Sequence, residues 1–215
     1  MTNNKQIQQL SSIMEVLKLA ERLKFELRHS WLSNGRQESV AEHTWRMSLM
    51  AVLLEPLLDQ KVDMARMLKM IIIHDLVEAE AGDISVLDQI RNPAIKKVKL
   101  ANEEKAINNL REMLWHSNGQ EIYDLFFEFE EKSTFEAKVA NAIDKLEVQL
   151  QHNHADIATR EEREYDLSFV MGKHVALNET MQQLKDLIEE QAQQKLAEAG
   201  LNIDEIRARA FSTFG

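Results

Sequence analysis

The scarcity of residues that break helices constrains this chain more than any other feature. Only two prolines and six glycines occur in 215 residues, and apolar residues recur at three- and four-residue spacing through most of the sequence. Leu10, Met14 and Leu17, for example, fall on one face of a predicted first helix that ends near Ala20. The pattern predicts an all-α fold.

Local capping signals indicate where the first helices begin and end. The segment 25–37, "FELRHSWLSNGRQ", interrupts the helical period and is expected to be an ordered loop. Ser39 and Glu42 match the Ser-x-x-Glu capping box, so a second helix should begin there. A third helix is predicted over 63–81, from an aspartate N-cap to a stop at Gly82.

The second half of the chain carries the same kinds of signal. Residues 92–93 read Asn-Pro, which is typical of an N-cap followed by a first-turn proline, and we expect this helix to end at 118–119. Two more helices follow, and the second opens with a predicted capping box at Ser133 and Glu136. The last long helix is predicted over about 164–198.

No internal repeat or low-complexity linker divides the chain. We therefore expect one domain over 1–215, with a core at about 15–170. The C-terminal helical extension, about 179–215, is rich in Gln, Glu and Lys, and we expect it to flank this bundle and to pack on a partner subunit.

The composition excludes several classes of function. The 26 Lys and Arg against 36 Asp and Glu leave a net charge of -10, which argues against binding to nucleic acid through its phosphate backbone. The absence of cysteine excludes disulfides, thiolate zinc sites and thiol catalysis, and it favours a cytoplasmic location. No apolar run approaches the roughly 18 residues of a membrane span, so we expect no membrane partner.

The segment 69–83, "KMIIIHDLVEAEAGD", places charged residues directly after an apolar run. At 100° per residue, His74, Asp75 and Glu78 share one side of the predicted helix. A satisfied core histidine beside a surface aspartate is the simpler interpretation of an isolated pair. The preceding isoleucines indicate burial, however, and burying an unpaired carboxylate costs several kcal/mol. A divalent cation would offset that cost.

Further ligands for such a cation must come from other helices. His43 lies near Trp45 and Met47, and Asp144 lies within the apolar pattern "NAIDKLEV". Together with His74 and Asp75 they would form a set of two histidines and two aspartates. Such nitrogen and oxygen donors suit one Mn, Fe, Co, Zn or Mg ion, and the sequence does not choose among them.

These four residues resemble the signature of the HD-domain metal-dependent phosphohydrolases, which is a histidine, a later His-Asp pair and a distant aspartate. The segments "RQESVAEHTWRMSLMA", "IIHDLVEAEAGDI" and "FEFEEKSTFEAKVANAIDKLE" are similar to the 5'-deoxynucleotidase branch of that family. The resemblance covers about residues 15–170. It implies an HD-domain helical bundle, a homodimer, and release of phosphate from deoxyribonucleoside 5'-monophosphates by a metal-activated water.

The resemblance also implies roles for residues that bind no metal. Arg28 lies fifteen residues before His43, where the branch has an arginine that orients the phosphate. Glu78 and Asp83 match its catalytic acids, and their roles as proton donor and as orienting group are interchangeable at this stage.

Other positions match the substrate-contacting part of the branch. Ile84, Ser85 and Val86 correspond to a turn that contacts the substrate, although the proline that many relatives carry after Gly-Asp is missing here. His29 stands where the branch commonly has tryptophan, and Trp31 follows two residues later. We include both in the predicted substrate site.

Two alternatives remain. One is an HD hydrolase of another nucleotide, either a deoxynucleoside triphosphate or guanosine tetraphosphate. Against it, Ala79 replaces the second acid of the tetraphosphate enzymes, and few basic residues lie near the motifs in sequence. The other is a non-enzymatic helical interaction protein with a structural metal, which would leave Arg28, Glu78 and Asp83 unexplained.

Several other conspicuous residues are interpreted as structural. His152 and His154 are expected at a solvated helix end. The acidic groups within 103–104, 128–131 and 161–164 are expected on solvated faces. The methionines between 47 and 70 are expected to fill the core.

Overall fold

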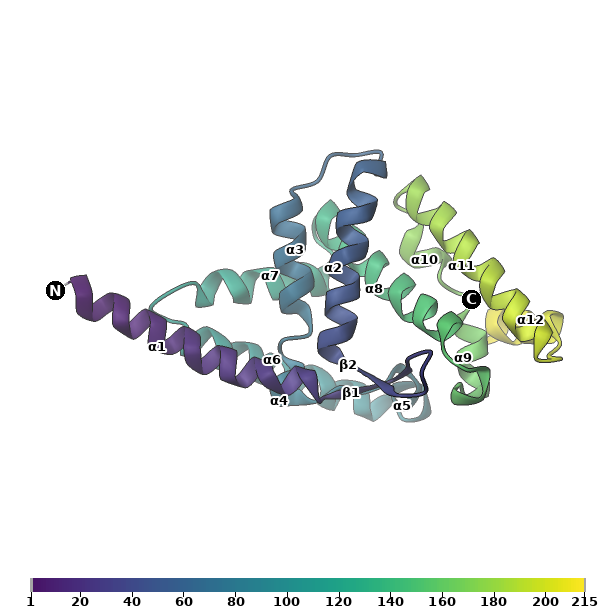
Figure 1. The fold of residues 1–215 in the computed structure, drawn as a ribbon, viewed down its shortest axis with the longest axis horizontal. Coiled ribbons are helices and arrows are strands. Elements are labelled where there is room, and N and C mark those ends of the chain that lie inside the picture. The colour runs from purple at the N-terminus through teal and green to yellow at the C-terminus, as the bar shows by residue number, and fades with distance from the viewer. Residues whose placement is uncertain (1, 215) are drawn as a thin grey trace.

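The computed structural model describes residues 2–214, and these form a mainly helical protein with one two-stranded antiparallel sheet (Figure 1). The longer helices are α1 (Thr2–Ala20), α2 (Val40–Leu54), α3 (Met64–His74), α6 (Pro93–Met113), α7 (Gly119–Glu131), α8 (Phe135–His154), α11 (Glu179–Glu198) and α12 (Ile203–Phe214). The short ones are α4 (Glu78–Ala81), α5 (Val86–Arg91), α9 (Glu162–Leu167), α10 (Gly172–Val175) and the 3-10 turns Glu21–Lys24, Glu55–Leu57 and Ile157–Thr159. None of the helices in this described part is long and apolar enough to cross a membrane.

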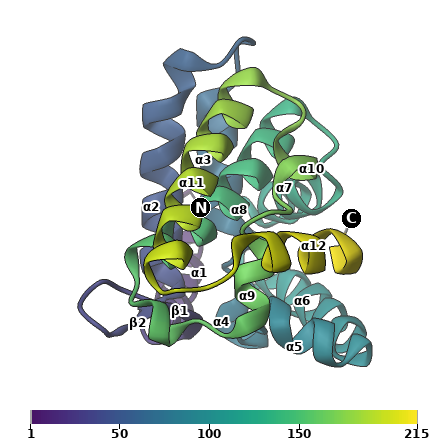
Figure 2. The same cartoon turned by 90° about the vertical axis from the view of Figure 1, so that its right-hand side faces the viewer.

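Helix α8 lies at the centre of the fold, where α2, α3, α7 and α11 pack against it (Figures 1 and 2). Its residues Ile143 and Leu146 are fully buried in the main apolar core. Met47, Met50, Met67 and Met70 are buried in the same core, and Met64 packs against it, as the sequence predicted. Because α8 is enclosed, any polar side chain that it carries inward needs a partner.

The segment that was expected to be a loop contains the sheet. Strands β1 (Leu27–Trp31) and β2 (Gln37–Ser39) pair antiparallel, with Leu27 opposite Ser39 and Trp31 opposite Gln37. The turn between them contains Asn34 and Gly35, and Gly35 has a φ of 84°. An Asn-Gly pair is a strong hairpin signal, so the expectation of an ordered loop missed the two strands although the sequence held the evidence.

The predicted start of α2 is confirmed. Ser39 accepts a hydrogen bond from the Glu42 N–H, and the Glu42 carboxylate accepts one from the Ser39 N–H at 2.9 Å. The predicted N-cap of α3 is confirmed too, because Asp63 accepts from the Arg66 N–H at 3.0 Å. These local bonds orient the two helices that carry the predicted histidines.

The predicted helix over 63–81 is interrupted after His74. The His74 Nδ1 lies 2.7 Å from the Ile71 carbonyl, and the chain continues in tight turns until α4 begins at Glu78. Gly82, with a φ of 77°, ends α4 as predicted. The single straight helix was therefore wrong, and Asp75 lies at a helix end rather than on a helix face.

Three further boundaries differ from the prediction. The connection before residue 92 contains α5, and the following helix ends at Met113, so that Gly119 begins α7 instead of ending α6. Thr134, not Ser133, caps α8. Glu136 instead accepts a hydrogen bond from the Asp63 N–H at 2.9 Å, which explains why its apparent capping box is unused.

The predicted long helix over 164–198 is divided into α9, α10 and α11. Asn178 is buried and accepts from the Met181 N–H at 3.1 Å, so it starts α11 as a new helix. Figure 2 shows α11 lying along α8, and its residues Met181 and Ile188 join the main core. The C-terminal extension therefore flanks the bundle and also contributes to its core.

Candidate functional site

The four predicted metal ligands meet at one place, where α2, the end of α3 and α8 converge. The His43 Nε2 lies 3.3 Å from Oδ1 of Asp144 and 3.8 Å from Oδ2 of Asp75. The His74 Nε2 lies 3.1 Å from Oδ1 of Asp75. Ligand atoms of His43, His74 and Asp75 all lie within 4.8 Å of one another, which is the spacing expected around a single ion.

Three of the ligand atoms that face this centre have no hydrogen-bond partner among the described residues, whereas Oδ2 of Asp144 accepts from Lys145 Nζ at 2.7 Å. The Nε2 atoms of His43 and His74 and Oδ2 of Asp75 are buried and unpaired. Leaving a buried polar atom unpaired costs about 1–3 kcal/mol. Three such atoms around one point therefore fit a bound divalent cation, for which imidazole and carboxylate are usual ligands.

The opposite nitrogen of each histidine is held by the protein. His74 Nδ1 faces the Ile71 carbonyl, and His43 Nδ1 is hydrogen-bonded to Glu147. Because a carbonyl or carboxylate oxygen only accepts, each Nδ1 must carry the proton. In the neutral ring, each Nε2 then presents its lone pair to the centre, as a metal ligand requires.

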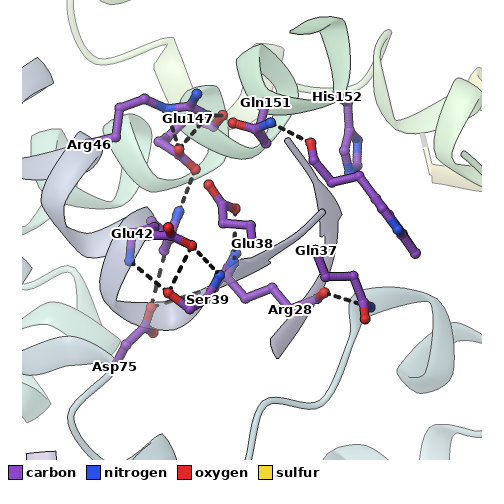
Figure 3. Close-up of polar contacts among 12 residues, drawn as sticks. Arg28, Gln37, Glu38, Ser39, Glu42, Arg46, Asp75, Glu147, Gln151 and His152 are labelled. Atoms are coloured by element: carbon purple, nitrogen blue, oxygen red, sulfur yellow. Dashed lines mark hydrogen bonds and ion pairs between the residues drawn. The ribbon is translucent and has the colours of Figure 1, made fainter. Parts of the chain in front are cut away.

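Glu147 is a residue of the site that the sequence analysis missed. It is fully buried and accepts a hydrogen bond from Nε of Arg46 at 2.6 Å (Figure 3). It lies one turn beyond Asp144 on α8, so a second carboxylate in the same apolar pattern was the available signal. Glu147 fixes the orientation of His43 without being one of the four predicted ligands.

The charged groups of the centre shift one another's pKa values. Burial and Arg28 lower the pKa of His43, but Glu147 and Asp144 raise it more, to about 10. Burial raises the pKa of Asp75, yet His74, His43 and Arg28 hold it well below its usual value. A cation bound between these groups would replace the His43 proton, so its affinity would increase with pH.

Arg28 lies beside the centre, between two carboxylates. Its Nη1 is 3.6 Å from Oδ2 of Asp75, and its Nε is 3.7 Å from Oε2 of Glu38 (Figure 3). Burial lowers the pKa of Arg28, but the negative charges of Asp75, Asp83 and Glu78 together raise it by more. The guanidinium therefore stays charged. A forked cation next to a metal centre can bind two phosphate oxygens.

Glu78 and Asp83 complete the acidic part of the site. Glu78 is buried with Oε2 unpaired, and Lys99 Nζ lies 3.7 Å from its Oε1. Burial, followed by the charges of Asp75 and Asp83, raises the pKa of Glu78 well above its usual value. Burial is also the main cause of the raised pKa of Asp83. Both are suited to hold a proton.

A cavity of about 640 Å³ adjoins the centre. The predicted site residues in its wall are Arg28, His29, His74, Asp75, Glu78, Asp83, Ile84, Ser85, Val86 and Asp144. Of the predicted substrate residues, Trp31 is absent from this wall, and its ring instead contacts that of His29 edge-on at 4.9 Å. The Ser85 hydroxyl caps α5 by accepting from the Asp88 N–H at 3.1 Å.

The wall also contains basic residues that the sequence analysis did not connect with the site. They come from α6, the end of α7, α8 and α10: Lys96, Lys99, Lys132, Lys145 and Lys173. Lys132 and Lys145 lie within the motif segment 127–147, whereas Lys96, Lys99 and Lys173 are distant from the HD motifs in sequence. The tertiary structure therefore brings cationic side chains into a cavity wall that also contains seven carboxylates.

Some residues interpreted as solvated are in fact buried. His152 is 5% exposed and lines the cavity, so placing it at a solvated helix end was wrong. Glu103, Glu128 and Glu164 are buried as well. Glu128 pairs with Arg66, which is 62 residues away and cannot be found from local sequence, whereas Glu103 pairs with Lys99 four residues earlier on the same helix.

The fold and the buried histidine–aspartate centre define a class of mainly helical proteins with a site suited to a divalent metal. A family model described as HD domain matches residues 20–185. The chain belongs to the HD domain family.

Individual relatives agree with this assignment. The chain is 34% identical to 5'-deoxynucleotidase HDDC2 of Xenopus laevis, over 65% of this chain and 67% of that protein. It is 33% identical to 5'-deoxynucleotidase HDDC2 of Dictyostelium discoideum, over 66% of this chain and 76% of that protein. Among solved structures, a predicted metal-dependent phosphohydrolase from Magnetospirillum magnetotacticum superposes with a TM-score of 0.73 at 26% identity, covering 90% of this chain and 98% of that chain.

Proposed function

We propose that this protein is a metal-dependent 5'-deoxynucleotidase that releases phosphate from deoxyribonucleoside 5'-monophosphates. The observation that carries the proposal is the arrangement of Arg28, Glu78 and Asp83 in the wall of the cavity that also contains His74, Asp75 and Asp144. A structural metal would need the ligands alone. The names of the relatives in Xenopus and Dictyostelium support the same substrate class.

Each group has a role that follows from its position. A divalent ion held by His43, His74, Asp75 and Asp144 would supply an activated water and polarise a phosphate oxygen. Arg28 would bind the other phosphate oxygens and hold the phosphorus in line for attack.

The buried acids would donate the proton to the leaving group and orient the reactants. Glu78, whose pKa is raised by burial, would donate a proton to the departing 5'-oxygen. Asp83 would orient the water or the sugar, and Lys99 holds Glu78 at the edge of the cavity. Glu78 and Asp83 could exchange these roles. Substituting each acid separately would show which one donates the proton.

We propose one divalent ion per chain. Two imidazole and two carboxylate donors suit Co, Mn, Fe, Zn or Mg, and neither thiolate nor thioether is among them. Metal analysis of the purified protein, followed by reconstitution of stripped protein with each ion, identifies the metal that supports turnover.

A second candidate function rests on the lysines. Five lysines around one cavity would also suit a longer phosphate chain, as in a deoxynucleoside triphosphate. The guanosine tetraphosphate type is less well supported, because Ala79 is fully buried against Leu23 and Val40 where a second acid would stand.

The test is phosphate release from a panel of deoxy- and ribonucleoside mono-, di- and triphosphates, with Co, Mn or Mg added to metal-stripped protein. Metal-dependent release from the deoxynucleoside monophosphates alone supports the proposal. Release from triphosphates instead would support the proposed site with a different substrate. A folded, metal-loaded protein that is silent across the panel would contradict an enzymatic role and favour a structural metal.

We also propose a homodimer in the cytoplasm. The α1 face that carries Leu10, Met14 and Leu17 is exposed, and so are Trp45 and Leu53 on α2. Figure 1 shows α1 extending beyond the rest of the fold, where a second copy could cover it. Light scattering after gel filtration measures the mass, and a fluorescent fusion reports the location.

A further inference from the structure

A second group of buried polar residues lines the same cavity away from the predicted metal ligands. It consists of His29 and Ser30 from β1, His152 from the end of α8, and Glu164 from α9. Ser30 is 2% exposed, Glu164 3% and His152 5%. The proposed chemistry of phosphate release uses none of the last three.

Several atoms of this group are unsatisfied. The Ser30 hydroxyl, Nδ1 of His152 and Nε2 of His29 are buried and have no hydrogen-bond partner among the described residues. Each unpaired buried atom carries a cost that a purely structural cluster would avoid. Because their side chains line a cavity, a ligand in that cavity can supply the missing partners.

Glu164 is held in a fixed position within the group. One carboxylate oxygen, Oε2, accepts a hydrogen bond from the Glu161 N–H at 2.7 Å, which closes the first turn of α9. The other oxygen, Oε1, lies 3.5 Å from Nε2 of His29 and 3.8 Å from Nε2 of His152. The helix cap therefore occupies one oxygen and leaves the other directed toward the two rings.

His152 is uncharged near neutral pH. Burial, followed by the positive charge of Arg160, lowers its pKa to about 3. A neutral imidazole has one donor and one acceptor nitrogen. The neighbouring Glu164 carboxylate favours the proton on the nitrogen that faces it, so the unpaired Nδ1 remains as an acceptor. This end of the cavity thus presents two acceptors, Nδ1 of His152 and Oε1 of Glu164.

The distance between the two polar groups matches a nucleotide. Asp144, Val148 and His152 are spaced four residues apart on α8, and all three line the cavity. Eight residues of helix at 1.5 Å each span about 12 Å. This is comparable with the reach of a nucleoside monophosphate from its phosphorus to the far edge of its base, and Val148 would lie beneath the sugar.

We propose that His152, Glu164 and Ser30 form a base-recognition subsite that selects deoxynucleotides whose base carries an exocyclic amino group. The inference rests on the proposed function and deepens it. Adenine, cytosine and guanine can donate from such an amino group to Glu164 and His152. The N3–H of thymine lies between two carbonyl oxygens, which would face the carboxylate and repel it.

The experiment compares kcat/KM for dAMP, dCMP, dGMP and dTMP in the metal-loaded wild type and in Glu164→Gln. The wild type should favour the best amino-bearing substrate over dTMP by about tenfold or more, and Glu164→Gln should reduce that ratio several-fold. Glu162→Gln is the matched control, because Glu162 is its exposed neighbour on α9. Ser30→Ala, which keeps the α9 cap intact, is a second variant that should lower kcat/KM for the preferred substrate.

Direct binding separates this inference from the proposed function. Calorimetry with dGMP, dCMP and dTMP uses metal-loaded Glu78→Gln, with and without Glu164→Gln. Equal turnover of all four nucleotides, unchanged by Glu164→Gln, would overturn the subsite while the nucleotidase stands. If the wild type releases no phosphate, the proposed function fails. A binding preference for dGMP or dCMP that Glu164→Gln removes would still support the subsite, and equal binding would overturn it.

Discussion

His43 Nε2 lies 3.3 Å from Oδ1 of Asp144, and these two atoms come from the first turn of α2 and the middle of α8. The histidine nitrogen has no hydrogen-bond partner in the described part of the chain, while its other nitrogen is bonded to Glu147. The two residues therefore meet across a space that suits a cation.

Removal of a ligand should abolish stabilisation by metal. For the wild type, a metal concentration one hundred times Kd should add about 2.7 kcal/mol to the free energy of unfolding. Asp75→Ala should bind no stoichiometric metal in elemental analysis, and its melting temperature should not respond to added ion. Asp124→Ala, at an exposed position on α7, should behave as the wild type. Full metal occupancy in Asp75→Ala would contradict the assignment.

Glu147 should tune metal affinity without being required for it. Glu147→Gln keeps the size of the side chain but weakens its hold on the His43 N–H. Loss of such an outer contact typically costs about 10- to 100-fold in metal affinity. Competition with a chelating dye measures the change. An unchanged Kd, equal to that of the exposed control Glu131→Gln, would show that His43 needs no such support.

Glu78 should be needed for turnover and not for metal binding. A lost general acid lowers the rate by about 10²- to 10⁴-fold, so Glu78→Gln should lower kcat by that range with unchanged metal content. Glu80→Gln is the control, since Glu80 is exposed on the same short helix and bonds Asn109. Intact turnover together with lost metal in Glu78→Gln would contradict this prediction.

His152 should make the fold sensitive to acid. Its folded pKa of about 3 lies below the unfolded value of about 6.5, so the unfolded state binds the proton more readily. The stabilisation is complete above about pH 6.5 and is lost as the pH falls toward 3. Between pH 7.5 and 5, His152 should account for about 2 kcal/mol of lost stability.

Denaturant titrations at these two pH values measure that loss. In His152→Gln the difference between pH 7.5 and pH 5 should shrink by this amount. His116→Gln removes an imidazole that is only partly buried and should leave the His152 contribution in place. Identical pH dependence in the wild type and His152→Gln would refute the buried neutral state.

The left-handed backbone conformation of Lys132 should lower the free energy of unfolding. It ends α7 with a φ of 52°, which is the left-handed region, and its side chain lines the cavity. That conformation costs an L-residue about 1–2 kcal/mol, so Lys132→Gly should raise the free energy of unfolding by about 1 kcal/mol.

A control variant on α8 should change the free energy of unfolding in the opposite direction. Lys138→Gly, at an exposed position inside α8, should lower stability by about 1 kcal/mol. Chemical denaturation distinguishes the two signs, and destabilisation by both variants would contradict the strain at Lys132.

The helix starts were predictable because their signals are local. Ser39, Asp63 and Asn92 each cap the helix that the sequence indicated, through bonds to residues two or three positions away. The interruptions were not predictable in the same way. The apolar period continues through residues 75–77 and past Ser168, so the pattern alone could not reveal where the chain turns.

The predicted metal ligands were visible in the sequence because their residue types conflict with their surroundings. A charged group in an apolar helix must find a partner, and this requirement points to His74, Asp75 and Asp144, although it applies equally to Glu147, which was missed. Arg28, Glu78 and Asp83 were indicated by the resemblance and not by the period, and their roles remain proposals.

By itself, the sequence determined a helical chain and most of its caps, and it indicated candidate metal ligands, because these depend on periodicity, short-range hydrogen bonds and the cost of burial. Only the tertiary structure decided that Glu147 supports His43, that lysines from distant helices share one cavity, and that His152 faces Glu164. Those relationships depend on how the helices pack, and single polar residues carry no local sign of the partner they will meet.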